Sequence, residues 1–217
     1  MNMDEKQAMV RDVALQIILI LIFIFTFLYM HGVPQRLLAK FRFRNRTSIQ
    51  AKRHFVKGAQ LLSQASRSNS TSLAKQALSE AEKSIALNPK DAASYILKAM
   101  ALDLQGFRTS ALDALDAALS PLASASLADA ERADALLKRA ELRIAASSQP
   151  RNVDSALADL KEAVKLSPKN AKAWCLLGEC CEGNKMEEEA KKAYKEALEL
   201  EPRLNTAQEA LNRLASS

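Results

Sequence analysis

The side chains best suited to chemistry in this sequence are its three cysteines, Cys175, Cys180 and Cys181, because the chain has only two histidines. Adjacent residues of a helix point about 100° apart, so Cys180 and Cys181 are poorly placed to bind one metal ion together with Cys175. Neither histidine lies near them in the sequence. Because a free cysteine packs like a small hydrophobic residue, we interpret the cluster as core and expect no metal site.

A second candidate is the acidic run Glu187, Glu188 and Glu189. It lies where a helix is expected to begin, and negative charge is favourable at that end of the helix dipole. We therefore assign it a structural role. The sequence contains no glycine-rich phosphate loop, no G-x-S-x-G motif and no H-E-x-x-H motif. We expect a protein that is not an enzyme and uses no cofactor.

Composition indicates which elements hold these residues. The 217 residues include 38 alanines, against only 5 glycines and 6 prolines. Alanine is the best helix former, and glycine and proline are the strongest helix breakers. A β-sandwich or barrel needs many turns and β-branched strands, which this composition does not supply. The predicted fold class is all-α.

The net charge of +6 is concentrated in one short segment. Residues 31–57 carry eight basic and no acidic side chains, whereas residues 58–217 carry 21 basic and 22 acidic ones. A nucleic-acid-binding domain spreads basic residues over a folded face and adds aromatic side chains that stack on bases. Nucleic acid is therefore disfavoured as a partner.

Residues 13–30 are uncharged and strongly apolar. A helix of about 20 such residues crosses the hydrocarbon core of a bilayer. A cleaved signal peptide is the alternative, but its apolar stretch is shorter, its start is basic, and it ends at a small-residue cleavage site that residues 30–34 do not offer. We predict an N-terminal tail at 1–12 and an uncleaved transmembrane helix at 13–33.

The flanking charges predict the orientation of this helix. Lys and Arg remain on the cytosolic side of a membrane, so residues 34–217 are expected in the cytosol and the N-terminus outside. The residues that flank the membrane segment most closely are Arg36, Lys40, Arg42, Arg44 and Arg46. The basic juxtamembrane segment at 34–57 either only sets this topology or also attracts anionic headgroups at 36–57. The endoplasmic reticulum is slightly favoured over an organelle outer membrane.

The rest of the chain is periodic. Its last 47 residues hold a W-x2-L-G pattern, an A-x3-Y-x2-A pattern and a following proline, formed by Trp174, Leu177, Gly178, Ala190, Tyr194, Ala197 and Pro202. This arrangement resembles the tetratricopeptide repeat, which implies two antiparallel helices that approach closely at small residues. Cys181 departs from the family, which usually has tyrosine there.

Similar positions recur upstream, with Leu160 in place of the aromatic Tyr194 and Tyr95 in place of Trp174. The matching small residues and proline are Ala99, Ala111, Ala118, Ala140, Ala156, Ala163 and Pro168. A four-residue insertion falls within 147–152. The resemblance therefore implies a solenoid of four helical hairpins at 58–91, 92–125, 129–170 and 171–203, and an apolar stripe predicts a capping helix at 204–217.

In the family, the first helices of the repeats line a concave groove that binds a protein or peptide. The positions that this resemblance assigns to the groove are Ile96, Leu97, Met100, Leu104, Leu137, Lys138, Glu141, Lys172, Cys175 and Glu179. The alternative is that some of these side chains pack between repeats. A chaperone C-terminal tail is disfavoured as ligand, because Leu62, Ser66 and Leu97 stand at the corresponding positions and both asparagines of the tail-binding members are missing.

Together these features predict a membrane-anchored adaptor that recruits a partner through its groove. An import or targeting receptor on an organelle outer membrane shares the same layout and is one alternative. A structural subunit that stabilises a membrane complex is another.

Overall fold

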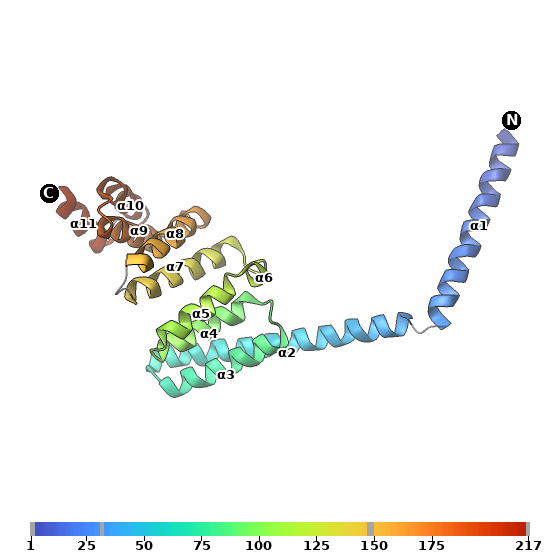
Figure 1. Cartoon of the computed structure of the whole chain (residues 1–217), viewed down its shortest axis with the longest axis horizontal. Coiled ribbons are helices and arrows are strands. Elements are labelled where there is room, and N and C mark those ends of the chain that lie inside the picture. The colour runs from blue at the N-terminus through green and yellow to red at the C-terminus, as the bar shows by residue number, and fades with distance from the viewer. Residues whose placement is uncertain (1–2, 31–32, 147–149, 216–217) are drawn as a thin grey trace. The chain divides into compact units, whose positions relative to one another are not determined.

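The computed structural model describes residues 3–30, 33–146 and 150–215, with side chains at 11, 13–27, 46–146 and 153–215. Within these ranges the secondary structure is helical and contains no strand (Figure 1). The chain divides into two compact units, residues 1–49 and 50–217. The predicted all-α class is confirmed for the described residues.

The first unit contains α1 (Met3–Met30) and the beginning of α2 (Val33–Ser68). The predicted membrane segment at 13–33 lies largely within α1, although positions 31 and 32 are outside the described residues. The large apolar side chains between Val13 and Phe27 are exposed, with Phe23 at 72%. No helix in the described part of the chain reaches the length and apolarity needed to cross a bilayer.

The second unit is a row of helical hairpins. After α2 come α3 (Thr71–Leu87), α4 (Ala92–Leu104), α5 (Arg108–Ala118), α6 (Pro121–Ser124), α7 (Asp129–Ala145), α8 (Pro150–Leu166), α9 (Ala171–Gly183), α10 (Glu187–Leu200) and α11 (Asn205–Ala215). The packed unit begins at Gln50, inside the stretch assigned from sequence to the basic segment at 34–57. Helix α2 is continuous through that stretch and forms the first helix of the first hairpin.

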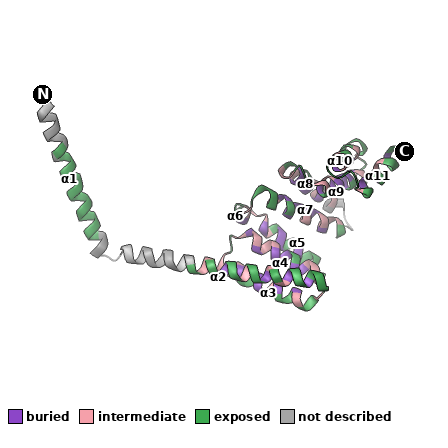
Figure 2. Cartoon of the chain, turned by 180° about the vertical axis from the view of Figure 1, so that it is seen from behind, coloured by how far each residue is buried: buried purple, intermediate pink, exposed green. Residues whose placement is uncertain are grey.

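Alanine is the side chain at the centre of every hairpin. Ala77, Ala111, Ala156 and Ala190 occupy equivalent positions on α3, α5, α8 and α10, and each has no exposed surface. A methyl group at this position lets the helix backbones approach closely, so the contact is dense without long side chains. The buried residues accordingly lie on facing sides of neighbouring helices (Figure 2).

Two hydrogen bonds donated by aromatic side chains support the alignment of the repeats with one another. The indole N–H of Trp174 donates to the carbonyl oxygen of Pro168 at 2.8 Å. Tyr95 makes the matching contact two hairpins earlier in the chain, where its hydroxyl donates to the carbonyl oxygen of Pro89 at 3.3 Å. Both bonds reach back six residues to the turn before the helix, so Tyr95 and Trp174 are equivalent, as the sequence predicts.

Repeats two and three are joined by charge as well as by apolar packing. Asp159 on α8 is 5% exposed and accepts hydrogen bonds from Arg139 Nε at 2.8 Å and Arg143 Nη1 at 2.6 Å. Arg139 also donates to Asp116 of α5 at 2.7 Å. The buried carboxylate is thus fully paired, which a low-dielectric position requires. The network fixes α7 against both α5 and α8.

The last repeat and α11 share one large apolar cluster that extends from Leu137 to Leu214. Within it, Glu182 accepts from Tyr194 at 3.0 Å and from Arg213 Nε at 2.9 Å, and these three residues come from α9, α10 and α11. Leu204 and Leu211 pack against the cluster, as expected for a capping helix. The cluster formed by α2, α3 and α4 is smaller and comprises Leu62, Ala77, Ala81, Leu97 and Ala101.

In the last repeat, α9 and α10 are in close contact at Gly178 and Tyr194. A Cβ atom added at Gly178 would lie 2.6 Å from Cε1 of Tyr194, whose side chain is fully buried. We expect Gly178→Ala to destabilise the chain by about 1–3 kcal/mol, because a trapped aromatic ring cannot move aside without strain. Urea unfolding followed by circular dichroism measures this change.

Gly183 provides the matched control, because it lies on the same helix and an added Cβ meets nothing within 4 Å. We expect Gly183→Ala to leave stability unchanged or to raise it, since alanine is the better helix former. Equal stability of Gly178→Ala and Gly183→Ala would contradict the proposed close packing against Tyr194.

The first hairpin contains a buried carboxylate, Glu80, on α3. Its Oε2 atom is 2.6 Å from Nδ1 of His54, and its Oε1 atom accepts from Nζ of Lys57 and of Lys83, each at 3.0 Å. These hydrogen bonds, that of His54 above all and then that of Lys83, lower the pKa of Glu80 from its ordinary 4.5 to about 2. The ionised carboxylate therefore connects α2 to α3.

The lowered pKa makes stability dependent on pH. The contribution of Glu80 is complete above the unfolded pKa of 4.5 and is lost as pH falls toward the folded pKa of about 2. We expect the free energy of unfolding to fall less steeply between pH 4.5 and 2 in Glu80→Gln than in the unmodified chain. Urea titrations at several pH values test this, and identical slopes would argue against the pairing.

Candidate partner-binding groove

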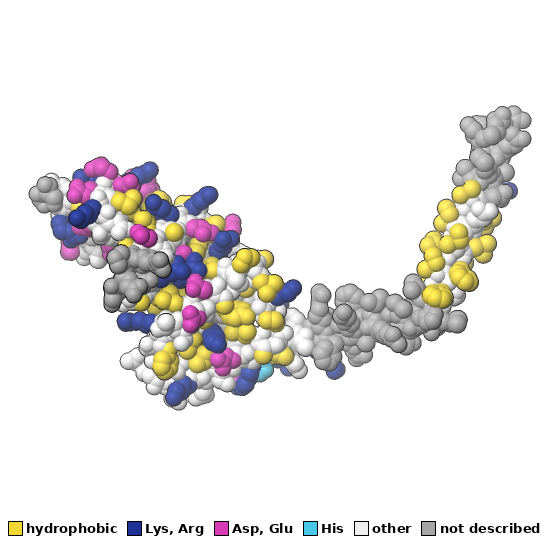
Figure 3. Space-filling model, in the orientation of Figure 1, with side chains coloured by type: hydrophobic (Ala, Val, Ile, Leu, Met, Phe, Trp, Pro, Cys, Tyr) yellow, Lys and Arg dark blue, Asp and Glu magenta, His cyan; other side chains and the backbone are white. Residues whose placement is uncertain are grey.

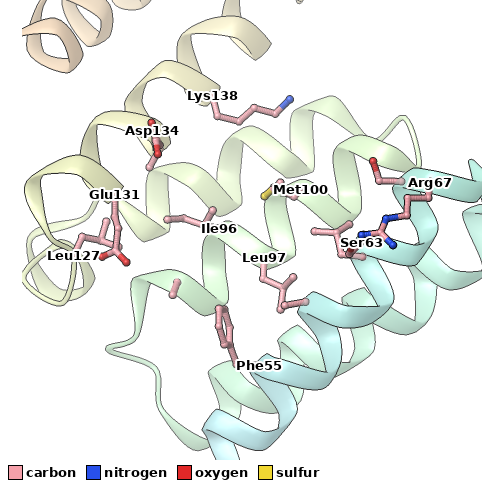
Figure 4. Close-up of a pocket in the computed structure, with 15 residues that line it drawn as sticks. Phe55, Ser63, Arg67, Ile96, Leu97, Met100, Leu127, Glu131, Asp134 and Lys138 are labelled. Atoms are coloured by element: carbon pink, nitrogen blue, oxygen red, sulfur yellow. The ribbon is translucent and has the colours of Figure 1, made fainter. Parts of the chain in front are cut away.

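A groove of about 750 Å³ opens on the N-terminal half of the repeat body. It is formed by α2, α4 and α7, the first helices of three successive hairpins, together with the connector before α7. Its lining comprises Phe55, Ala59, Leu62, Ser63, Ser66, Arg67, Ala93, Ile96, Leu97, Met100, Leu127, Glu131, Asp134, Ala135 and Lys138. Figure 4 shows these side chains converging from three helices.

Helical periodicity explains which side chains reach the groove. On α4 the lining positions 93, 96, 97 and 100 follow i, i+3, i+4 and i+7 spacing, which places them on one face. Positions 131, 134, 135 and 138 of α7 have the same spacing, and positions 55, 59, 62 and 66 of α2 follow i, i+4, i+7 and i+11, which also keeps them on one face. Three amphipathic faces therefore meet at one hollow.

The floor of the groove is apolar. Phe55, Leu62, Ile96 and Leu97 pack in or against the buried clusters below it, whereas Met100 is 45% exposed. Methionine is flexible and polarisable, so it adapts to different apolar partners. Hydrophobic side chains gather on this face of the repeat body, with acidic and basic side chains beside them (Figure 3). An apolar centre with a charged margin suits a peptide or helix better than a small polar substrate.

Charged residues mark the margins. Glu131 and Asp134 lie toward one end of the groove and Arg67 toward the other (Figure 4). The Glu131 carboxylate accepts from the backbone N–H of Ala128 at 2.9 Å and so belongs to the start of α7. Arg67 and Asp134 are exposed and make no ion pair with the described residues. These two side chains are available for charges on a ligand.

Lys138 is paired within the protein. Its Nζ lies 2.8 Å from Asp103 and 3.5 Å from Glu141. Burial acts to lower the pKa of Lys138, but the hydrogen bonds and charges of Asp103 and Glu141 outweigh it, and the pKa is raised. Lys138 therefore stays protonated and contributes mainly to the margin of the groove between repeats two and three.

The ten positions assigned to the groove from sequence are thus divided by the structure. Ile96, Leu97, Met100 and Lys138 line this cavity, and the other six do not. Leu104 packs against the first buried cluster, and Leu137 is part of the C-terminal one. Glu141 bridges Lys138 and Lys172 at 3.5 and 2.6 Å, which links α7 to α9.

Cys175 is 6% exposed, and its thiol lies 3.5 Å from the hydroxyl of Thr206 on α11. The capping helix therefore covers this position, and Cys175 packs between repeats rather than facing an open groove. Glu179 is exposed one turn further along α9 and lies outside the cavity. For Cys175, packing between repeats describes the structure better than a groove does.

Sequence reasoning missed the contribution of α2. Phe55 is not among the positions assigned to the groove from sequence, and Leu62 and Ser66 are noted there only because they lack the asparagines of the tail-binding members. The apolar spacing of Phe55, Ala59 and Leu62 was the available signal, since it continues one helical face. Leu127, in the connector after α6, had no comparable signal.

The remaining sequence candidates are structural. Cys175, Cys180 and Cys181 are buried free thiols, and burial, followed by the neighbouring Cys181, raises the pKa of Cys180 to about 11. The described residues contain no group of His, Cys, Asp or Glu arranged for a metal ion. Glu187, Glu188 and Glu189 occupy the first turn of α10, as predicted.

Known proteins with this architecture provide an independent comparison. Residues 171–204 match the sequence model of the tetratricopeptide repeat family. The fold is a tetratricopeptide-repeat solenoid. No curated protein matches the chain in sequence.

Solved structures show the same fold at low sequence identity. YrrB, described as a TPR protein with an unusual peptide-binding site, is 19% identical with a TM-score of 0.58, over 71% of this chain and 73% of that one. The pilF protein of Pseudomonas aeruginosa is 18% identical with a TM-score of 0.60, over 80% and 69%. MamA from Desulfovibrio magneticus RS-1 is 18% identical with a TM-score of 0.60, over 77% and 84%.

Proposed function

We propose that this protein is a membrane-anchored adaptor whose groove recruits a partner protein or peptide. The observation that carries the proposal is the groove between α2, α4 and α7, with exposed Met100 on its floor and with the exposed side chains of Arg67 and Asp134 at its margin. The description of YrrB as a TPR protein with a peptide-binding site agrees with such a use of the fold.

The anchor is the second part of the proposal. It is supported by the 18 uncharged residues at 13–30 in the sequence and by the exposure of the apolar side chains at 13–27. A helix that is hydrophobic all round requires an apolar environment, which a bilayer supplies. The eight basic residues at 31–57 favour the cytosol for the repeats and the opposite side for the N-terminus.

Tethering supplies the mechanism. An anchored groove meets its partner at the effective concentration set by the membrane surface, so a modest intrinsic affinity is enough for recruitment. The adaptor then needs no conformational change and no chemical step. The endoplasmic reticulum is the membrane that we favour, because the predicted span is very apolar.

Met100→Glu tests the groove. The residue is 45% exposed, so the fold tolerates the change, while a carboxylate on the floor repels an apolar ligand. Burying that charge costs a ligand more than about 1.4 kcal/mol, which corresponds to a tenfold loss of affinity. We expect proximity labelling by the full-length protein to recover groove-dependent partners at about one tenth of the unmodified level.

Leu200→Glu is the matched control, since it places the same carboxylate on an exposed apolar residue of α10 outside the groove. Its labelled partners are expected to equal those of the unmodified chain. Unchanged labelling in Met100→Glu would remove the groove from the proposal. Recovery mainly of targeting peptides would favour an import receptor, and a stable stoichiometric complex would favour a structural subunit.

Topology is tested by a glycosylation acceptor in the chain itself. Asn69, Ser70 and Thr71 form an N-x-T pattern at the turn between α2 and α3, where Asn69 is exposed. Because the repeats are expected in the cytosol, the chain expressed in eukaryotic cells should show no glycosidase-sensitive mass at this site.

The control for that experiment replaces residues 1–30 with a cleavable secretory signal, which sends the repeats into the lumen. Because Asn45, Arg46 and Thr47 form a second acceptor, this variant is expected to acquire up to two glycans, and Asn69→Gln removes one of them. A glycan at Asn69 of the unmodified chain would reverse the proposed orientation and place the groove among secretory-pathway proteins.

A further inference from the structure

A second hollow, of about 610 Å³, lies on the first hairpin and has a different chemical character from the groove. It is lined by Gln50, Arg53, His54, Lys57, Glu80, Lys83, Ala86 and Leu87. The α2 residues follow i, i+3, i+4 and i+7 spacing, so one helical face supplies that wall. Residues of α3 supply the opposite wall. None of these residues lines the groove described above.

The charge of the hollow is positive. Arg53, Lys57 and Lys83 contribute three cationic groups and Glu80 one anionic group, so the sum is +2 with His54 neutral and +3 with His54 protonated. The Glu80 carboxylate is 6% exposed, whereas the side chains of Lys57 and Lys83 are 64% and 52% exposed. The negative charge is therefore beneath the hollow and the positive charges are at its surface.

Glu80 organises these cations. It holds the ammonium groups of Lys57 and Lys83 at 3.0 Å each and the His54 ring at 2.6 Å, from both sides of the hollow. Each ammonium has three donors and uses one on Glu80, which leaves donors directed to solvent. Arg53 is exposed and has no ion pair with the described residues, so its guanidinium is available for bidentate contact with an oxyanion.

We propose that this hollow binds a phosphomonoester group, presented either by a phosphorylated lipid headgroup or by a free phosphate compound. A phosphomonoester carries a charge of about −1.5 to −2 at neutral pH, which matches the hollow better than the single charge of a carboxylate or phosphodiester. The described lining contains no aromatic side chain apart from His54, so stacking of nucleic acid bases is not favoured. Ala86 and Leu87 add an apolar edge, which suits a lipid.

Isothermal titration of the full-length chain in neutral detergent micelles tests the site. The ligands are dioctanoyl phosphatidylinositol 4-phosphate, dioctanoyl phosphatidylcholine and inorganic phosphate. We expect the phosphoinositide to bind and the phosphatidylcholine not to bind. Tighter binding of the phosphoinositide than of inorganic phosphate identifies a lipid as the source, and equal binding identifies a free phosphate compound. Absence of binding by both phosphate ligands overturns the proposal.

Variants at Arg53 locate the binding. Arg53→Glu is expected to weaken phosphoinositide binding by at least about tenfold, because it reverses one charge at the surface of the hollow. Arg53→Lys should retain binding within a few-fold. Lys75→Glu makes the same reversal of charge on an exposed residue of α3 outside the hollow and should leave affinity unchanged. Equal losses in Arg53→Glu and Lys75→Glu would show a general charge effect and overturn the site.

Discussion

Close contact between helices through side chains of one carbon or none is the constraint on which this structure depends. Ala77, Ala111, Ala156 and Ala190 are fully buried at the centres of four hairpins, and at Gly178 even a methyl group is too large. Where two helices approach this closely, only small side chains fit between them, so the small residues of one helix must lie opposite the contact point of the other. The repeated spacing of small residues therefore fixes how one hairpin stacks on the next, and stacking in turn determines which faces are left open.

The groove is a product of that stacking rather than of any single helix. Phe55, Met100 and Asp134 are far apart in the sequence and meet because α2, α4 and α7 are each the first helix of a hairpin. The Arg139–Asp159–Arg143 network and the Glu141 bridges hold α7 in place from the side away from α2. Polar interactions between repeats thus help to preserve the shape of an apolar surface, and Lys138, which Glu141 pairs, also lies at the margin of that surface.

The fold was largely accessible from the sequence, and the site was accessible only in part. Small residues, prolines and the Trp174 pattern are local signals, so they identified the hairpins and the ends of their helices. The groove depends on how the hairpins turn relative to one another, which local periodicity does not encode. That is why Ile96 lines the cavity while Cys175, at the equivalent position of the last repeat, is covered by α11. The pairing of Asp159 with Arg139 and Arg143, and of Glu80 with His54 and Lys57, was equally hidden, because in each case the partners come from a different helix.

The uneven distribution of apolar packing has a consequence for how binding and folding are coupled. The C-terminal repeat and α11 form one large buried cluster, whereas the first hairpin, which supplies six of the fifteen residues that line the groove, rests on the much smaller cluster around Leu62 and Leu97. In a solenoid, each repeat is stabilised by its own core and by its neighbours. A ligand that binds only the folded groove would consequently raise the free energy of unfolding at the end of the solenoid with the smaller buried cluster. The bound ligand would then stabilise the N-terminal end of the solenoid, as α11 stabilises the C-terminal end, but only while the ligand is present.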